Sequence, residues 1–317
     1  MGTLDYVKRM KKFLKNTFIY ILPIILIGWS AELLLRNIPN DYQIKKQYLD
    51  HNAESIEVLY LGSSHAFHGI NPNHCTVNSY NAALSSQSID YDYAILKKYE
   101  SQFNHLKYIV IPISYFTLYS RLESSIEASL VKNYVIYYNI NTSNKFTNHF
   151  EVLSSKPFAL FKRLYSYYIQ RNTRRCAELG WGMNNDLRSD TDLLRSGKAA
   201  AFRHSGNINE YYELNVQVVK DIIEWAKSKD IKVILYTPPA YKSYTNELDS
   251  IQLNQTLITM KRIDDQYENA AYYNLLTDSA FVANDYYDAD HLNSAGAKKL
   301  TKLLDGVVTK EIDHVIK

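Results

Sequence analysis

The chain has 317 residues, and 36 Lys and Arg against 33 Asp and Glu give it a formal net charge of +3. Hydrophobic residues make up 46% and charged residues 22%, which excludes a disordered or fibrous protein and suits one α/β domain with an inserted segment. Five cations lie together between Lys8 and Lys15, and the remainder is close to neutral. The sequence has no basic stripe of the kind that binds phosphate backbones, so nucleic acid is not an expected partner.

An apolar stretch follows the basic cluster, from Thr17 to Ala31, and Leu33–Leu35 continue it after Glu32. About 20 such residues span a bilayer, and the preceding cations predict a cytoplasmic amino terminus. Residues 1–35 are therefore expected to form a basic tail and a single-pass anchor at the cell membrane, with the folded domain outside the cytoplasm. Two alternatives stay open: a signal peptide cleaved near Gly28 and Ser30, and a buried core helix.

The remaining chain alternates short apolar runs with segments of helical periodicity. This order predicts a three-layer α/β/α sandwich with a mostly parallel sheet, as in flavodoxin-like folds, with its site at the carboxyl ends of the strands. The expected strands are 56–61, 76–80, 108–113, 231–237 and 272–276, and the expected helices are 89–99, 209–229, 246–267 and 294–304.

Two polar segments interrupt this pattern. Residues 36–54, which contain Asn37, Pro39 and Asn40, predict a linker from the membrane to a domain spanning 55–317. Between about 115 and 205 regular alternation is lost, which predicts a helical insertion in that domain.

Three polar residues in two distant segments suggest nucleophilic catalysis. Gly62-Ser63-Ser64-His65 directly follows the first expected strand, where a tight turn into a helix would expose one serine. A serine hydroxyl needs a base within hydrogen-bond reach and a carboxylate that orients the base. The segment Asp288-Ala-Asp-His291 supplies both in one loop.

These segments resemble the blocks of the SGNH, or GDSL-like, hydrolases. Gly62-Ser63-Ser64 resembles the first block, with Ser63 in the place of the usual Asp, and His291-Leu-Asn-Ser-Ala-Gly296 resembles the continuation of the last block. The resemblance implies that Ser64 is the nucleophile, His291 the base and Asp288 the orienting acid.

The middle blocks depart from the family pattern. Asn81 to Ser86 resemble the second block, with Ala83 and Ser86 in its two glycine places, and the backbone of Ala83 is an expected oxyanion donor. The asparagine of the third block has no counterpart, and Ser114 stands in its region. Asn81, Ser114 and His65 are further candidates for contacts to the oxyanion or the substrate, and His68 either lines the pocket or closes a turn.

The layout also resembles membrane-anchored proteins that modify envelope polymers, including the D-alanyl transfer proteins of the teichoic-acid pathway. The resemblance implies a serine esterase or acyltransferase that moves an O-acyl group, with acetyl favoured, on an extracytoplasmic polysaccharide through an acyl-serine intermediate. An envelope glycan and a membrane-bound acyl-donor protein are the expected partners. The alternative is a non-catalytic SGNH-fold protein that binds or assembles such a polysaccharide.

The sequence gives no indication of a cofactor or a metal cluster. Asp288 and His291 have no second group of His or Cys at ligand spacing. Cys75 and Cys176 are the only cysteines, and their pairing stays open because an exported domain would permit a disulfide.

Overall fold

The computed structural model describes residues 3–315 except 143, 174, 184–192 and 206–209. Within these residues the chain divides into two units. The first contains residues 1–40 and 131–174, and the second contains residues 41–130 and 175–317.

The second unit is built on a five-stranded parallel sheet in the order β2-β1-β3-β4-β5. This is the order of flavodoxin-like doubly wound folds, and it confirms the α/β prediction. The strands are β1 (Val58–Tyr60), β2 (Ser79–Asn81), β3 (Tyr108–Pro112), β4 (Lys232–Thr237) and β5 (Ala270–Asn274). The helices are α2 (Asp41–Asn52), α3 (Ser64–Gly69), α4 (Ile89–Tyr99), α7 (Leu193–His204), α8 (Tyr212–Lys227), α9 (Lys242–Thr245), α10 (Ser250–Gln266) and α11 (Ser294–Val315).

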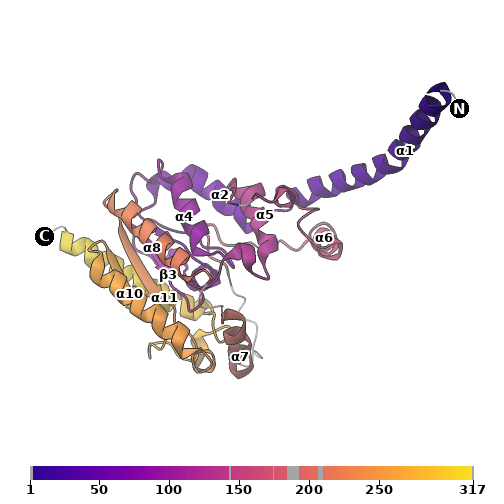
Figure 1. The fold of residues 1–317 in the computed structure, drawn as a ribbon. Coiled ribbons are helices and arrows are strands. Elements are labelled where there is room, and N and C mark those ends of the chain that lie inside the picture. Colours follow the sequence, from indigo (N-terminus) through magenta and orange to yellow (C-terminus); the bar gives the residue numbers. More distant parts are fainter. Residues whose placement is uncertain (1–2, 143, 174, 184–192, 206–209, 316–317) are drawn as a thin grey trace. The chain divides into compact units, whose positions relative to one another are not determined.

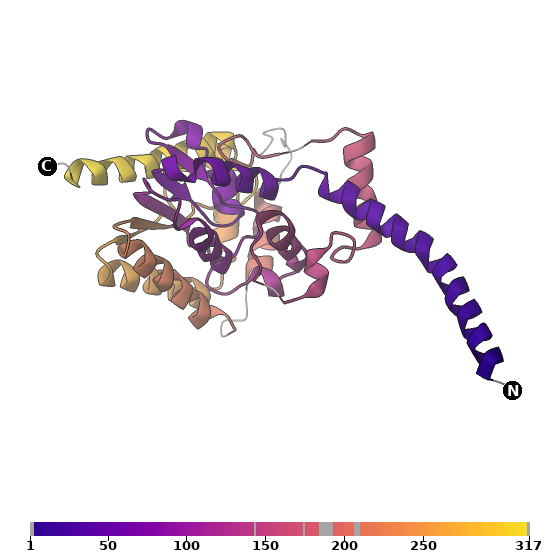
Figure 2. The same ribbon diagram turned by 90° about the horizontal axis from the view of Figure 1, so that it is seen from above.

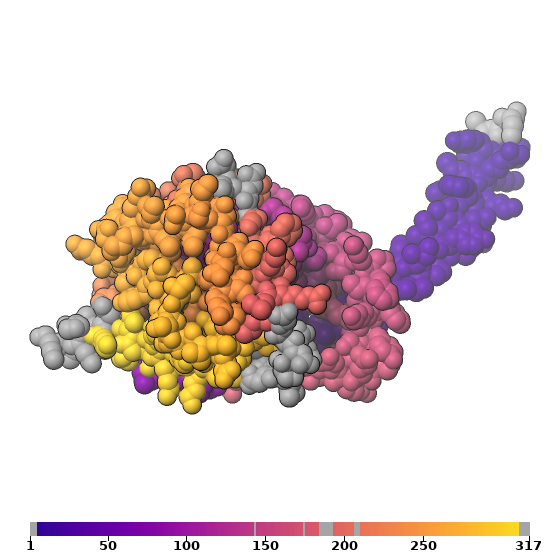
Figure 3. All heavy atoms as spheres, turned by 90° about the horizontal axis from the view of Figure 1, so that it is seen from below, coloured from indigo at the N-terminus to yellow at the C-terminus, as the bar shows by residue number. Residues whose placement is uncertain are grey.

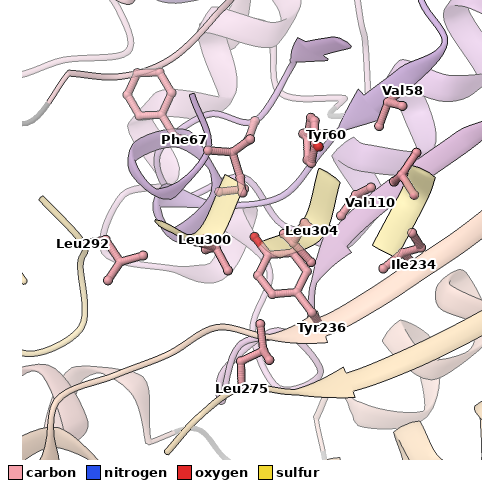
Figure 4. Close-up of a cluster of buried hydrophobic side chains, with 14 of the residues drawn as sticks. Val58, Tyr60, Phe67, Val110, Ile234, Tyr236, Leu275, Leu292, Leu300 and Leu304 are labelled. Atoms are coloured by element: carbon pink, nitrogen blue, oxygen red, sulfur yellow. The ribbon is translucent and has the colours of Figure 1, made fainter. Parts of the chain in front are cut away.

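Helices cover both faces of this sheet. Alternate strand residues point to opposite faces, and Tyr60, Val110 and Tyr236 pack with Phe67 of α3 and Leu300 of α11 in one buried cluster (Figure 4). Figure 2 shows α11, in yellow, on one side of the sheet and the orange helices on the other. Residues of the carboxyl-terminal part of the chain also form much of the surface seen from below (Figure 3).

The expected element boundaries differ from the observed ones by a few residues. The helix expected from Asn246 begins at Ser250 as α10, because the Asp249 side chain accepts the backbone N–H groups of Ile251 and Gln252 and so caps the helix there. The helix expected to end at Leu304 continues to Val315. The residue at which another helix was expected to begin, Asn209, lies outside the described residues.

The interpretation of residues 36–54 as a linker is wrong for most of its length. Residues 41–52 form α2, whose Tyr42, Lys45 and Leu49 are buried. The segment is polar in sequence, but the ammonium group of its Lys45 is buried against backbone carbonyls of the second unit.

The first unit contains α1 (Thr3–Arg36), α5 (Val131–Asn133), a π-helical turn η5 (Tyr134–Tyr138), α6 (Pro157–Leu164) and a π-helical turn η7 (Tyr165–Ile169) that continues α6. The helix α1, at the indigo end of the chain in Figure 1, is long and apolar enough to span a membrane. The expected insertion, 115–205, is thus shared: 131–174 belong to this unit, and the rest of its described residues belong to the second.

Candidate active site

The nucleophile candidate lies at the junction between a buried strand and a short helix. After β1, Gly62 adopts a φ of +109° and Ser64 begins α3. A Cβ on Gly62 would lie 2.4 Å from Cγ of Pro112, so this turn requires glycine both for its dihedral and for its close contact with β3. The turn places Ser64 at the carboxyl edge of the sheet, where open α/β folds bind ligands.

Ser64, His291 and Asp288 form a continuous hydrogen-bonded chain. His291 Nε2 lies 2.8 Å from Ser64 Oγ, and His291 Nδ1 lies 2.9 Å from Asp288 Oδ1. The Asp288 carboxylate also accepts the backbone N–H of His291 at 2.8 Å, which fixes the loop around its own histidine. With the proton on Nδ1 donated to Asp288, the lone pair of Nε2 faces the serine hydroxyl, which is the tautomer required of a general base.

A second carboxylate lies behind the imidazole. Asp290 is 3% exposed, and its Oδ2 lies 3.6 Å from His291 Nδ1 and 3.7 Å from His65 Nε2. Burial by itself lowers the pKa of His291, but Asp290 and then Asp288 outweigh it, so the pKa lies above the ordinary value. Burial raises the pKa of Asp290, but His291 and His65 more than offset this and keep the carboxyl ionised at neutral pH.

The sequence analysis did not single out Asp290. It stands within the Asp288-Ala-Asp-His291 segment, one residue before the histidine, and the alternation of carboxylates in that segment was the available signal.

His65, Asp290 and His291 could also hold a metal ion by their mutual distances. His291 Nδ1, however, already faces Asp288, so this geometry is accounted for by the hydrogen-bonded chain.

The four candidates for oxyanion or substrate contacts lie beside the site and bond within the protein. Asn81 donates through Nδ2 to the carbonyls of Ala66 and Ile70 and accepts the Ala83 N–H at 3.0 Å through its own Oδ1. Ala83 is fully buried, and its N–H donates to Asn81 and not to the pocket. This differs from its expected role as an oxyanion donor. Asn81 instead binds carbonyls within and just after α3, the helix that carries the nucleophile candidate.

Ser114 and His65 form a buried pair. Ser114 Oγ lies 2.6 Å from His65 Nδ1, and both side chains are less than a tenth exposed. Burial lowers the pKa of His65, with partial compensation from Asp290. A neutral His65 packs against the His291 ring, with centroids 5.2 Å apart, and so supports the imidazole from behind.

Two backbone N–H groups without a protein acceptor are further candidates for oxyanion donors. Ser64 and Ser86 both line the pocket, and neither N–H donates to another group within the described part of the chain. The first N–H groups of a helix have no intrahelical acceptor, which explains Ser64. Ser86 has a φ of +62° in a turn closed by a bond from Gln87 N to Leu84 O, a conformation that favours glycine. Its place in the sequence, where the family has its second glycine, was the signal for it.

Ser64 and His291 line a pocket of about 420 Å³. Hydroxyl groups dominate one part of its wall, and His68 and His204 lie beside the catalytic candidates. His68 Nδ1 lies 2.7 Å from the Gly182 carbonyl oxygen, so this residue lines the pocket while fixing a loop. Other lining residues are Ser85, Ser88, Asp92, Pro112, Phe116, Ser120, Arg121, Ile126, Glu127, Arg203 and Ser205.

Comparisons with known proteins give one family match and several similar solved structures. Residues 198–305 match a family model described as a protein of unknown function, DUF1574, and this segment includes Asp288 and His291 but not Ser64. No curated protein matches the chain.

Three of the similar solved structures are a provisionally described acylhydrolase from Bacteroides fragilis, a provisionally described lipolytic protein of the G-D-S-L family from Desulfitobacterium hafniense, and a GDSL-like lipase from Bacteroides thetaiotaomicron. The first two are each 12% identical to this chain and the third is 11% identical, and each has a TM-score of 0.40. They cover 86%, 79% and 86% of this chain, and the alignments span 97%, 98% and 99% of their own chains. At these identities the inference about function depends on the geometry of the site.

Proposed function

We propose that this protein is a serine esterase or acyltransferase whose nucleophile is Ser64. The observation that carries the proposal is the 2.8 Å contact between Ser64 Oγ and His291 Nε2, with His291 held in turn by Asp288, at the wall of a pocket. A serine, a base and an orienting carboxylate in this order define acyl transfer chemistry irrespective of the fold that carries them.

The reaction proceeds in two balanced steps. Ser64 Oγ attacks the acyl carbon while His291 Nε2 takes the hydroxyl proton, and the N–H groups of Ser64 and Ser86 are candidates to stabilise the oxyanion. His291 returns the proton to the leaving alcohol, and an acyl-Ser64 ester forms. An incoming water or acceptor hydroxyl then gives its proton to His291 and attacks the ester, which regenerates Ser64.

The proposed substrate is an O-acylated polysaccharide of the cell envelope, with acetyl as the group moved. The many hydroxyl groups of the pocket and the cations Arg121 and Arg203 suit a hydroxylated or anionic acceptor, and a pocket of about 420 Å³ suits a short acyl chain beside a sugar. The anchor proposal supports the location, because α1 would hold the catalytic unit outside the cytoplasm, where a membrane-bound acyl-donor protein could supply the acyl group.

Labelling with a fluorophosphonate tests the nucleophile. The purified full chain is expected to carry one adduct, mapped to Ser64 by mass spectrometry, and Ser64→Ala and His291→Ala are expected to lose it. Ser228→Ala, at the end of α8 and outside the pocket, is the matched control and retains full labelling. Absence of labelling in folded wild-type protein would favour the binding or assembly alternative.

Ester turnover then separates the substrate classes. We expect p-nitrophenyl acetate to be hydrolysed faster than the octanoate ester, and acetylated oligosaccharides to serve as acyl donors or acceptors. Preference for the octanoate would contradict the proposed acetyl group while leaving the nucleophile unaffected.

A further inference from the structure

The first unit carries an unusual concentration of exposed apolar side chains outside α1. Within α6 and its continuation η7, Phe158 is 78% exposed, Phe161 65%, Tyr165 46% and Ile169 65%. Their spacing of three or four residues places them in one stripe along the helix. Neither element has a buried residue, so this apolar stripe stays exposed in the unit.

The polarity of α6 is reversed relative to a helix that packs on a protein core. Arg163, about 200° around the helix from both Phe161 and Tyr165, points inward and binds the fully buried carboxylate of Glu151 through Nη1 at 2.7 Å. Lys132 Nζ lies 2.8 Å from the same carboxylate. The charged face of α6 is thus fixed to the unit, and its aromatic face is left outward.

Contacts at the end of α1 determine where this aromatic face lies. Glu32, the residue that interrupts the apolar stretch in the sequence, accepts the backbone N–H groups of Glu151 and Val152 at 3.0 Å each. Tyr168 donates its hydroxyl to the carbonyl of Leu34 at 3.0 Å. Figures 1 and 2 both show α6 beside the carboxyl-terminal end of α1.

The membrane boundary of α1 falls at the same residues. The apolar stretch from residue 17 to 35 is about 28 Å long at 1.5 Å per residue, close to the thickness of the hydrocarbon core. Most side chains of α1 before Glu32 are exposed, whereas Glu32 and Leu35 are buried in the unit. The α6–η7 segment is therefore attached at the level of the lipid headgroups.

We propose that the stripe of Phe158, Phe161, Tyr165 and Ile169 inserts into the interface of the bilayer that α1 spans, on the side where α1 ends. The inference rests on the proposed anchor. Amphipathic helices with aromatic residues on one face and cations beside them occupy this interface, and the exposed Lys156 and Lys162 suit anionic headgroups. The contact fixes the first unit on the membrane at two points, α1 and α6.

Spin labels on the full chain test the proposal in vesicles of phosphatidylcholine and phosphatidylglycerol. Single cysteines are introduced at Phe161, at Ala159 on the opposite face of α6 and at Ile24 of α1, with both native cysteines replaced by alanine. The ratio of collisions with oxygen, which dissolves in lipid, to collisions with a water-soluble nickel chelate is expected to be severalfold higher at Phe161 than at Ala159.

The label at Ile24 separates failure of this inference from failure of the anchor. A lipid-like ratio at Ile24 with equal, water-like ratios at Phe161 and Ala159 would overturn the interfacial contact and retain the anchor. Water-like ratios at all three positions would overturn both. A label at Ile258 of α10, which is 52% exposed in the second unit, supplies the water-exposed reference.

Discussion

Asp290 Oδ2 lies 3.6 Å from Nδ1 of His291, the ring nitrogen that Asp288 already holds at 2.9 Å. Two carboxylates therefore act on one imidazole. Asp288 is part-exposed and fixes the ring by hydrogen bonding, whereas Asp290 is buried and acts through its charge. Because a charge in a poorly solvated setting is weakly screened, Asp290 would, in the proposed mechanism, stabilise the imidazolium that forms when the serine is deprotonated.

The first prediction is that Asp290→Asn shifts the pH dependence of Ser64 reactivity. Burial lowers the pKa of His291, and without the charge of Asp290 only Asp288 opposes this effect. The imidazole should therefore stay neutral to a lower pH. The acidic limb of the fluorophosphonate labelling rate should move to lower pH. The rate near neutrality should also fall, because the imidazolium of the transition state loses a stabilising charge.

The exposed Asp265→Asn, which is matched in charge, controls for net charge and should leave the profile unchanged. An unshifted acidic limb in Asp290→Asn would mean that Asp288 alone sets the pKa of His291.

The second prediction concerns the turn that presents the nucleophile. Gly62→Ala places a Cβ within 2.5 Å of two Pro112 carbons at a φ of +109°, so the turn must shift. We expect loss of labelling at Ser64 and a stability decrease of about 2–4 kcal/mol, the range of severe backbone strain with overpacking. Gly306→Ala, where the added Cβ meets nothing within 4 Å in α11, should be neutral or slightly stabilising by urea unfolding.

The sequence predicts the sheet well because its signals are local. The β-branched run of 231–237 and the glycine after the first apolar run predict β4 and the turn before Ser64, and the triad residues lie on the expected loops. Ala83 was expected to donate to an oxyanion, yet its N–H is taken by Asn81. A backbone N–H direction depends on dihedrals, such as the positive φ of Ser86, that residue type alone does not specify.

Long-range contacts explain the other differences. Residues 36–54 were interpreted as a linker because they are polar and begin with Asn37, Pro39 and Asn40, but the ammonium of Lys45 is buried against segments more than 35 residues away in sequence. Likewise Glu32 looked like an interruption of the anchor, and it binds backbone groups of residues 151 and 152. A charged residue in a sequence indicates solvent until its distant partner is known.

The third prediction is that Lys45 stabilises the second unit. Its Nζ donates to the carbonyls of Asn81, Ala83 and Gly180 and thereby joins α2 to the end of β2. Lys45→Met retains the aliphatic volume and leaves these acceptors without their donor, so the free energy of unfolding should fall by about 3 kcal/mol. Lys46→Met removes a surface pair with Asp50 and should change it by less than about 1 kcal/mol. Equal effects in urea unfolding would contradict the structural role of the buried ammonium.

The fourth prediction concerns a buried carboxyl beneath the nucleophile turn. Asp92 accepts the Gly62 N–H at 2.8 Å and the Gln87 amide at 2.5 Å. Burial raises its pKa to about 8, although both hydrogen bonds oppose the change. A carboxyl whose folded-state pKa is raised contributes stability that is complete below its unfolded pKa, near 4, and is lost as the pH rises through about 8.

Asp92→Asn retains an oxygen for the Gly62 N–H and removes the ionisation. The free energy of unfolding of wild type should therefore decrease between about pH 4 and pH 8 relative to that of Asp92→Asn. At pH 8 the variant should be the more stable by at least about 1.4 kcal/mol, the value of one pKa unit. Asp92→Leu, which leaves the Gly62 N–H without an acceptor, should lose stability at every pH and reduce labelling of Ser64. If wild type and Asp92→Asn instead have parallel stability profiles in urea unfolding, Asp92 is ionised in the folded protein and supports Gly62 as a carboxylate.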